Sequence, residues 1–154
     1  MADQISVSRV IPSPPGPIFD LLADPSRHRE IDGSGTVQGA RSGSRRLALG
    51  DTFGMSMRLG VPYSTRNVVV TFEENRRIAW QTLAPPPISR VLTGRVWRYE
   101  LDPVAGGTTV TETWDISTEA APSRPFVRAF MSASTRAAME RTLERIEAVV
   151  APAG

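Results

Sequence analysis

Hydrophobic and polar residues alternate along much of the chain, which is the pattern of β-strands with one buried face. Seven segments show this period of two, at 4–11, 36–41, 51–59, 63–73, 77–83, 93–101 and 108–117. Turn-forming residues at 74–76 and 103–107 separate neighbouring segments and favour hairpins. We therefore predict an antiparallel sheet of about seven strands. One face is buried, and threonine, arginine and glutamine face water on the other.

Two short helices are predicted directly after the first strand. Ser13 is a good N-cap, and prolines are tolerated in a first helical turn because their missing N–H would have no partner there. Asp24 precedes Pro25 and therefore avoids the helical region, so the first helix ends there. A second short helix is predicted at 26–31, before the loop at 32–35.

The longest predicted element is a helix over residues 123–150. Apolar or small residues recur on one side of it at spacings of three and four, namely Phe126, Val127, Phe130, Met131, Ser134, Ala138, Thr142, Ile146 and Val149. At about 1.5 Å per residue this helix exceeds roughly 35 Å, so only a sheet of comparable width can bury its stripe. We predict one α+β domain over residues 1–154, with a frayed tail at 151–154.

Composition excludes several kinds of catalytic chemistry. The 154 residues include no cysteine and a single histidine, His28. Thiolate metal sites, cysteine nucleophiles and zinc sites built from several histidines are therefore excluded within one chain. No G-x-S-x-G motif accompanies His28, so a Ser-His-Asp relay is not indicated. We expect no metal and no cofactor.

The charge pattern favours an ordinary mixed surface. All 18 basic residues are arginines, yet the formal net charge is only +2 and the arginines are scattered. We therefore expect no nucleic-acid partner. No window approaches ~18 uninterrupted apolar residues, so no membrane insertion is expected. The N-terminal residues lack the features of a secretory signal, which makes a cytoplasmic location the default expectation.

Six segments together carry a family resemblance, at 19–28, 32–35, 66–72, 77–80, 97–101 and 109–115. In this order they resemble the START-like (SRPBCC) helix-grip superfamily, and most of all its actinobacterial branch known as polyketide cyclase/dehydrase and lipid transport. The resemblance implies a curved sheet wrapped on the long C-terminal helix, with an apolar cavity between them. It implies little about chemistry, because this fold hosts carriers, hormone receptors, cyclases and co-chaperones.

Large apolar residues identify the inward face of each predicted strand, and the resemblance implies that this face lines the cavity. The predicted ligand-contacting residues are Phe53, Met55, Met57, Arg66, Val68, Val70, Trp80, Trp97, Tyr99, Glu112, Trp114, Phe130, Ser134 and Ala138. Small helix residues opposite large aromatic residues leave room for a guest, or they simply let the helix pack closely. The methionines form an adaptable wall, or they merely fill gaps in the core.

Glu112 is the sharpest chemical signal. It shares the strand phase of Val110 and Trp114, which places a carboxylate on the buried face. A buried carboxylate either finds a partner or has a raised pKa. Tyr99 is expected opposite it across the hairpin, and Arg66 is a second inward polar candidate. Such a cluster would hold a ligand's hydroxyl or carbonyl group, act as acid and base, or only fix the sheet.

Three classes of function remain open. The preferred class is a non-enzymatic binder of a small hydrophobic molecule, such as a lipid, polyketide or isoprenoid. A cyclase, aromatase or dehydratase would use Glu112 and Tyr99 as general acid and base. A co-chaperone-like interaction module would use the outer sheet face, where a row of threonines shows no apolar patch. His28, four residues before Asp32, is expected to be a surface residue paired with that carboxylate.

Overall fold

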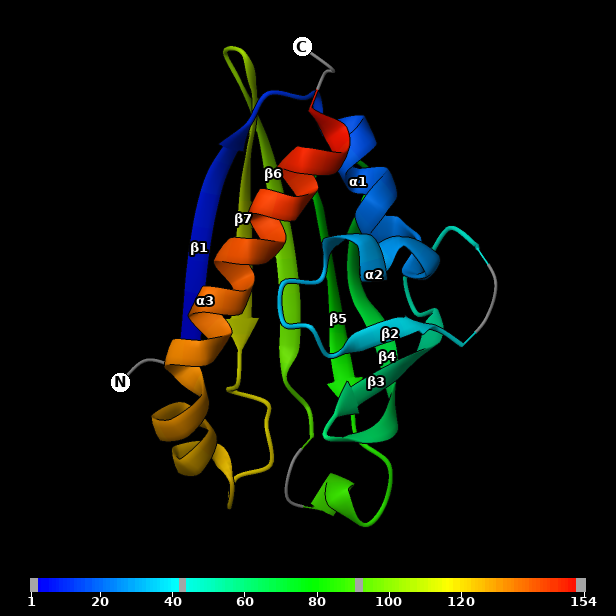
Figure 1. Ribbon diagram of the computed structural model, residues 1–154, viewed down its shortest axis with the longest axis vertical. Helices are drawn as coiled ribbons and strands as arrows, with labels where there is room; N and C mark the ends of the chain where they lie inside the picture. The colour runs from blue at the N-terminus through cyan, green and yellow to red at the C-terminus, as the bar shows by residue number, and fades with distance from the viewer. Residues whose placement is uncertain (1–2, 42–43, 91–92, 152–154) are drawn as a thin grey trace.

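The computed structural model describes residues 3–41, 44–90 and 93–151 (Figure 1). Its elements are β1 (Gln4–Ile11), α1 (Pro15–Ala23), η1 (Pro25–Arg27), α2 (His28–Ile31), β2 (Val37–Ala40), β3 (Thr52–Leu59), β4 (Val61–Glu73), β5 (Arg77–Leu83), η2 (Ile88–Arg90), β6 (Val96–Val104), β7 (Gly107–Asp115) and α3 (Arg124–Val150). The predicted order of strand, two short helices, further strands and long helix is confirmed. Apart from Ala151, the predicted frayed tail lies outside the described residues.

The seven strands form one antiparallel sheet in the order β1-β7-β6-β5-β4-β3-β2. Strands β2 to β7 each pair with their neighbour in the chain, and β1 pairs with β7 at the far edge. Figure 1 shows that the sheet curls and that α3 runs diagonally across its concave side, ending beside α1. The predicted α+β helix-grip architecture is therefore confirmed.

The core lies between the concave face of the sheet and the helices. The inward phase predicted for β3, β6 and β7 is confirmed, because these strands bury Phe53, Met55, Tyr99, Leu101, Val110, Glu112 and Trp114. Helix α1 buries its whole apolar face, Ile18, Phe19, Leu21 and Leu22. Its predicted N-cap is wrong, since Pro14 occupies that position and the Ser13 hydroxyl donates to the Pro14 carbonyl instead.

The phase predicted for β4 is wrong because this strand contains a β-bulge. The register against β5 shifts between Val69 and Thr71, so one extra residue interrupts the alternation. Phe72 packs against the core after the bulge, whereas Asn67 and Val69 are the buried residues before it. Counting back from Phe72 in steps of two therefore selects the wrong face of the first part of β4.

Three predicted ligand-contacting residues consequently lie on the outer face of the sheet. Arg66 and Val70 are exposed, and Val68 is half-buried on that same face. Their predicted inward orientation is wrong, and an arginine beside the buried carboxyl group of Glu112 is not part of the interior. The error follows from the single bulged residue, since a shift of one residue moves every side chain of a strand to the other face.

Helix α3 buries residues along only part of its predicted stripe. Its buried side chains are Val127, Met139, Thr142, Leu143 and Ile146. Phe130 is 73% exposed and Ser134 is exposed, so their predicted packing against the sheet is wrong, while Ala138 is half-buried. The first turns of α3 extend beyond the start of β1 and the end of β7 (Figure 1). Among the described residues, no helix has the length and apolarity needed to cross a membrane.

Candidate functional site

Glu112 and Tyr99 form a buried hydrogen-bonded pair on the inner face of the sheet. They are directly opposite each other in the antiparallel pairing of β7 and β6. The Tyr99 hydroxyl donates to Glu112 Oε1 over 2.8 Å. The two residues are 5% and 2% exposed. The predicted burial of Glu112 and its position opposite Tyr99 are therefore confirmed, while their contact with a ligand stays a prediction.

Burial determines the protonation of this pair. It raises the pKa of Glu112 to about 8, because the carboxylate form loses its solvation. The hydrogen bond from Tyr99 opposes this rise in pKa, and the negative charge of Asp32 adds to it. Burial also holds the pKa of Tyr99 well above its usual value, and the adjacent Glu112 acts in the same direction. At neutral pH the carboxyl and the phenol are therefore mostly neutral.

Two buried polar atoms at this site have no hydrogen-bond partner among the described residues. They are the second carboxyl oxygen of the pair, Glu112 Oε2, and the indole nitrogen Nε1 of Trp114. Glu112 and Trp114 are two positions apart on β7 and share its inner face. Because Glu112 Oε1 accepts from Tyr99, the proton of the neutral carboxyl group belongs on Oε2. Both atoms are then unused donors, and each unpaired buried donor costs about 1–3 kcal/mol.

His28 belongs to the aromatic core beside this site, so its predicted surface position is wrong. Its ring is 7% exposed and stacks on Trp80 at 4.9 Å, with Phe53 at its edge. Its Nε2 lies 2.9 Å from the Leu22 carbonyl and donates to it. Burial lowers the pKa of His28 and favours the neutral ring. Asp32 instead accepts hydrogen bonds from its own loop.

The interior is solidly packed at the end where α3 terminates. There β6 supplies Leu101, β7 supplies Val110, and α3 supplies Leu143 and Ile146, each at most 1% exposed. We call these residues the packed end. The predicted cavity between the sheet and α3 does not extend to this end, because these side chains fill the space there.

The opposite end of the same interior is less completely buried. Met57 near the end of β3, Trp97 near the start of β6 and Met131 near the start of α3 contact the core but are only half-buried. We call these residues the open end. Burial thus declines toward this end along β3 and β6, whereas Val127 of α3 and Trp114 of β7 are at most 1% exposed there. A hollow at this end stays a prediction.

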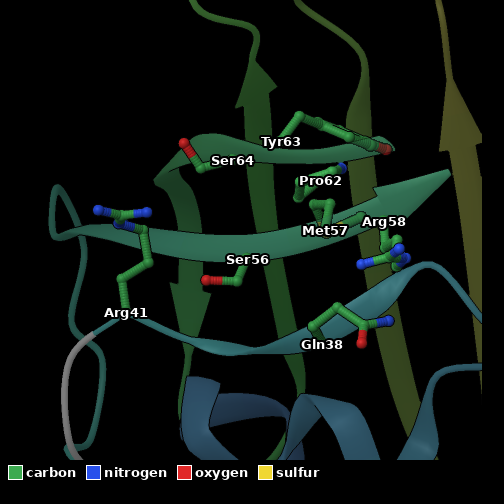
Figure 2. A pocket seen from close by; sticks show the side chains of 8 residues that line it. All are labelled: Gln38, Arg41, Ser56, Met57, Arg58, Pro62, Tyr63 and Ser64. Carbon is green, nitrogen blue, oxygen red and sulfur yellow. The ribbon is translucent and has the colours of Figure 1, made fainter. Parts of the chain in front are cut away.

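Two pockets lie outside the interior. One, of about 430 Å³, is formed by β2, β3 and β4 and is drawn in Figure 2. The other, of about 360 Å³, lies between residues 12–15 and the turn near Pro103 and Gly107. Neither pocket lies between the sheet and α3. The sequence does not predict the first pocket, because Ser56 and Arg58, which line it, follow the pattern of an ordinary solvated strand face.

The fold and the buried pair of Glu112 and Tyr99 together define a helix-grip domain with polar groups in an apolar interior. Residues 2–151 match the family described as polyketide cyclase / dehydrase and lipid transport, and the chain belongs to this family. The resemblance noted from the sequence is therefore confirmed.

The chain is also similar to curated mycobacterial proteins. Uncharacterized protein Rv0088 of Mycobacterium tuberculosis (strain ATCC 25618 / H37Rv) is 35% identical over 114 residues, covering 73% of this chain and 47% of that protein. The chain spans about half the length of the curated relatives it matches.

Solved structures share the fold at low sequence identity. Protein CV1439 from Chromobacterium violaceum has a TM-score of 0.73 at 14% identity, with 99% of each chain covered. The di-domain ARO/CYC StfQ from the steffimycin biosynthetic pathway has a TM-score of 0.65 at 16% identity, covering 96% of this chain and 50% of that one. At these identities the likeness concerns the fold alone.

Proposed function

We propose that this chain binds one small, largely apolar molecule at the open end, with an oxygen atom of the ligand accepting hydrogen bonds from Glu112 and Trp114. The observation that carries the proposal is the pair of buried donors without partners, Glu112 Oε2–H and Trp114 Nε1–H. Buried polar groups in native proteins nearly always have a partner, so a site with two free donors is suited to an acceptor from outside the chain.

The open end supplies the apolar part of such a site. Met57, Trp97 and Met131 are half-buried, so a ligand that covers them removes apolar surface from water at roughly 25 cal/mol per Å². Two of the three are methionines, whose flexible thioether side chains adapt to irregular shapes. The description of the family as lipid transport supports a hydrophobic ligand.

The protonation of the site favours a neutral ligand group. With Glu112 and Tyr99 both neutral near pH 7, a carbonyl oxygen accepts from both free donors without bringing a charge into the interior. A lipid ester, a polyketide ketone and an oxygenated isoprenoid all carry such an oxygen. Among the ligand classes considered, the site therefore suits a carbonyl-bearing molecule.

Native mass spectrometry of freshly purified protein tests the proposal, with an added mass that organic solvent extracts as the expected result. Trp114→Phe keeps an aromatic ring but removes the indole donor, and should weaken binding of the extracted molecule by about tenfold. Glu112→Gln retains a side-chain donor and should bind it well. Phe72→Tyr, a changed ring beside Phe19 of α1, serves as the matched control and should bind like the wild type. Unchanged binding by both Trp114→Phe and Glu112→Leu would contradict the proposal.

A second candidate function is favoured by the same pair of residues. A neutral carboxyl group with a pKa of about 8 is suited to general acid catalysis near neutral pH, and Tyr99 holds it in place. The chain would then act on a polyketide-like substrate as a cyclase, aromatase or dehydratase; the structurally similar StfQ is described as ARO/CYC. Turnover of the extracted molecule that Glu112→Gln abolishes, while binding persists, would decide for the enzyme.

A further inference from the structure

The outer face of β2, β3 and β4 carries arginines without counter-charges. Residues 37–41 and 52–68 include Arg41, Arg58 and Arg66 but no aspartate or glutamate. All three arginines are exposed. Within the described part of the chain, none of them forms an ion pair. This face is therefore locally positive although the whole chain is nearly neutral.

The strand register brings these arginines together around two serines. Gly54 is directly opposite Arg66, and Ser56 is directly opposite Ser64, in the pairing of β3 with β4. Arg58 follows two positions after Ser56 on the same face of β3. The serine pair thus lies between the position of Arg66 and that of Arg58, and its hydroxyl groups are additional hydrogen-bond donors.

Gly54 gives Arg41 a fixed place on this face. The Arg41 backbone N–H donates to the Gly54 carbonyl over 3.0 Å. A Cβ atom at position 54 would lie 2.9 Å from Cδ of Arg41 and 3.3 Å from its Cβ, closer than side chains tolerate. The missing side chain of Gly54 therefore lets the Arg41 stem lie along the sheet rather than extend into solvent.

A pocket of about 430 Å³ lies among these residues (Figure 2). Its lining residues are Gln38, Arg41, Ser56, Met57, Arg58, Pro62, Tyr63 and Ser64. Figure 2 shows Arg41 and Arg58 at opposite ends, with Ser56 between them. Positions 54 and 58 are about 13 Å apart along an extended strand, so the two ends suit a ligand with more than one anionic group.

We propose that this pocket, bordered by Arg66, binds a phosphate-type oxyanion that carries at least two anionic groups, such as a pyrophosphate ester or the head group of an anionic lipid. The guanidinium fork matches the oxygen atoms of phosphate and forms charge-assisted hydrogen bonds with them. The serines and Arg58 of this oxyanion pocket lie on the outer face of the sheet, while Met57 and Tyr63 border it from the inner face. The proposed anion contacts involve neither Glu112 nor Trp114, so substitutions of the arginines test this pocket separately from the proposed apolar ligand.

Calorimetric titration with inorganic pyrophosphate at low ionic strength tests the pocket, with saturable binding at one site as the expected result. Arg41→Gln and Arg58→Gln should each weaken binding by about tenfold, and Gly54→Ala should weaken it by displacing Arg41. Arg136→Gln removes an exposed arginine of α3 as the matched control and should bind like the wild type. Variants that fold normally and bind as tightly as the wild type would overturn the proposal.

Sedimentation with vesicles distinguishes the two sources of the oxyanion. Binding to vesicles that contain cardiolipin, whose head group carries two phosphates, but not to phosphatidylcholine vesicles, lost in Arg41→Gln and Arg58→Gln, would assign the pocket to a lipid head group. Binding of pyrophosphate without vesicle binding would assign it to a free phosphate compound. The absence of both kinds of binding would overturn the proposal, whatever the result for the apolar ligand.

Discussion

The packed end and the open end are built from the same elements but differ in what they do for the molecule. At the packed end, aliphatic side chains of β6, β7 and α3 are at most 1% exposed. At the open end, methionine and tryptophan side chains of β3, β6 and α3 remain half-buried. The difference shows that the C-terminal half of α3 supplies most of its core residues, whereas its N-terminal half buries only Val127 and leaves Met57 and Trp97 half-buried.

Stability and binding are therefore expected to depend on different ends of one interior. Glu112 and Trp114 lie between the two ends, on the strand that supplies Val110 to the packed end. Their unpaired donors cost stability in the free protein, and a ligand at the open end would remove this cost. Variants along the interior can test whether this division is real.

The largest contrast is expected between two truncations on α3. Ile146→Ala at the packed end should lower the free energy of unfolding by about 4 kcal/mol, because it leaves a cavity in close-packed surroundings. Met131→Ala at the open end should cost less than about 1.5 kcal/mol, because that side chain is only half-buried. Urea denaturation of both variants measures the contrast. Equal losses would show that the two ends are packed alike.

The next effect is the pH dependence that Glu112 gives to stability. The pKa of Glu112 is about 8 in the folded chain and close to 4.5 in the unfolded chain. Below the lower value both states are protonated; as pH rises toward 8 the unfolded state loses its proton first, so stability falls and then stays low. Glu112→Gln does not titrate, so above about pH 8 it should exceed the wild type by on the order of 3 kcal/mol.

Unfolding free energies at acidic and alkaline pH check this prediction. Glu100→Gln is the matched control, because Glu100 lies on the outer face of β6. If the wild type and Glu112→Gln show the same pH profile, the carboxyl group of Glu112 is solvated in the folded protein and the described site is wrong.

A smaller effect is expected at Gly33, where the loop after α2 touches the middle of α3. The Gly33 N–H donates to Thr142 Oγ1 over 3.0 Å, and a Cβ atom there would lie 2.2 Å from the Ala138 carbonyl oxygen. Gly33→Ala should therefore lower the melting temperature and cost roughly 2 kcal/mol. Gly16→Ala in α1, where nothing lies within 4 Å, is the control and should be neutral or stabilising. A neutral Gly33→Ala would mean that the loop does not hold α3.

The smallest effect is expected at Phe130. This side chain is 73% exposed and its main aromatic neighbour is Phe126, with ring centroids 4.8 Å apart. Phe130→Ser should change the free energy of unfolding by less than about 1 kcal/mol. Thermal denaturation checks this value, and a large loss would place Phe130 in the core, contrary to the described packing.

The sequence was sufficient where hydrophobic alternation runs without interruption between clear turns. The strands β3, β6 and β7 meet this condition, and their inner faces were predicted correctly, as was the position of Glu112 opposite Tyr99. A buried glutamate in phase with tryptophan and valine is a strong signal, because polar residues rarely occupy such positions.

The errors have local physical causes that the alternation does not record. The bulge near Val69 contains no glycine or proline, so the sequence of β4 does not indicate that its inward-facing positions change there. The spacing of His28 to Asp32 suggests a surface pair, but His28 also lies three residues before the buried Ile31 and so shares one side of α2. Phe130 fits the three-and-four spacing of the helix stripe, but it lies in the part of α3 where most side chains are exposed.

The indole N–H resonance of Trp114 reports directly on whether this donor meets an oxygen atom of a ligand. It can be assigned among the three tryptophans by Trp114→Phe and followed by NMR while an apolar ketone, 2-undecanone, is added. We expect a saturable downfield shift with the ketone and a much smaller change with undecane, which lacks the oxygen acceptor. A Trp114 signal that responds equally to both compounds, or to neither, would contradict the proposed binding.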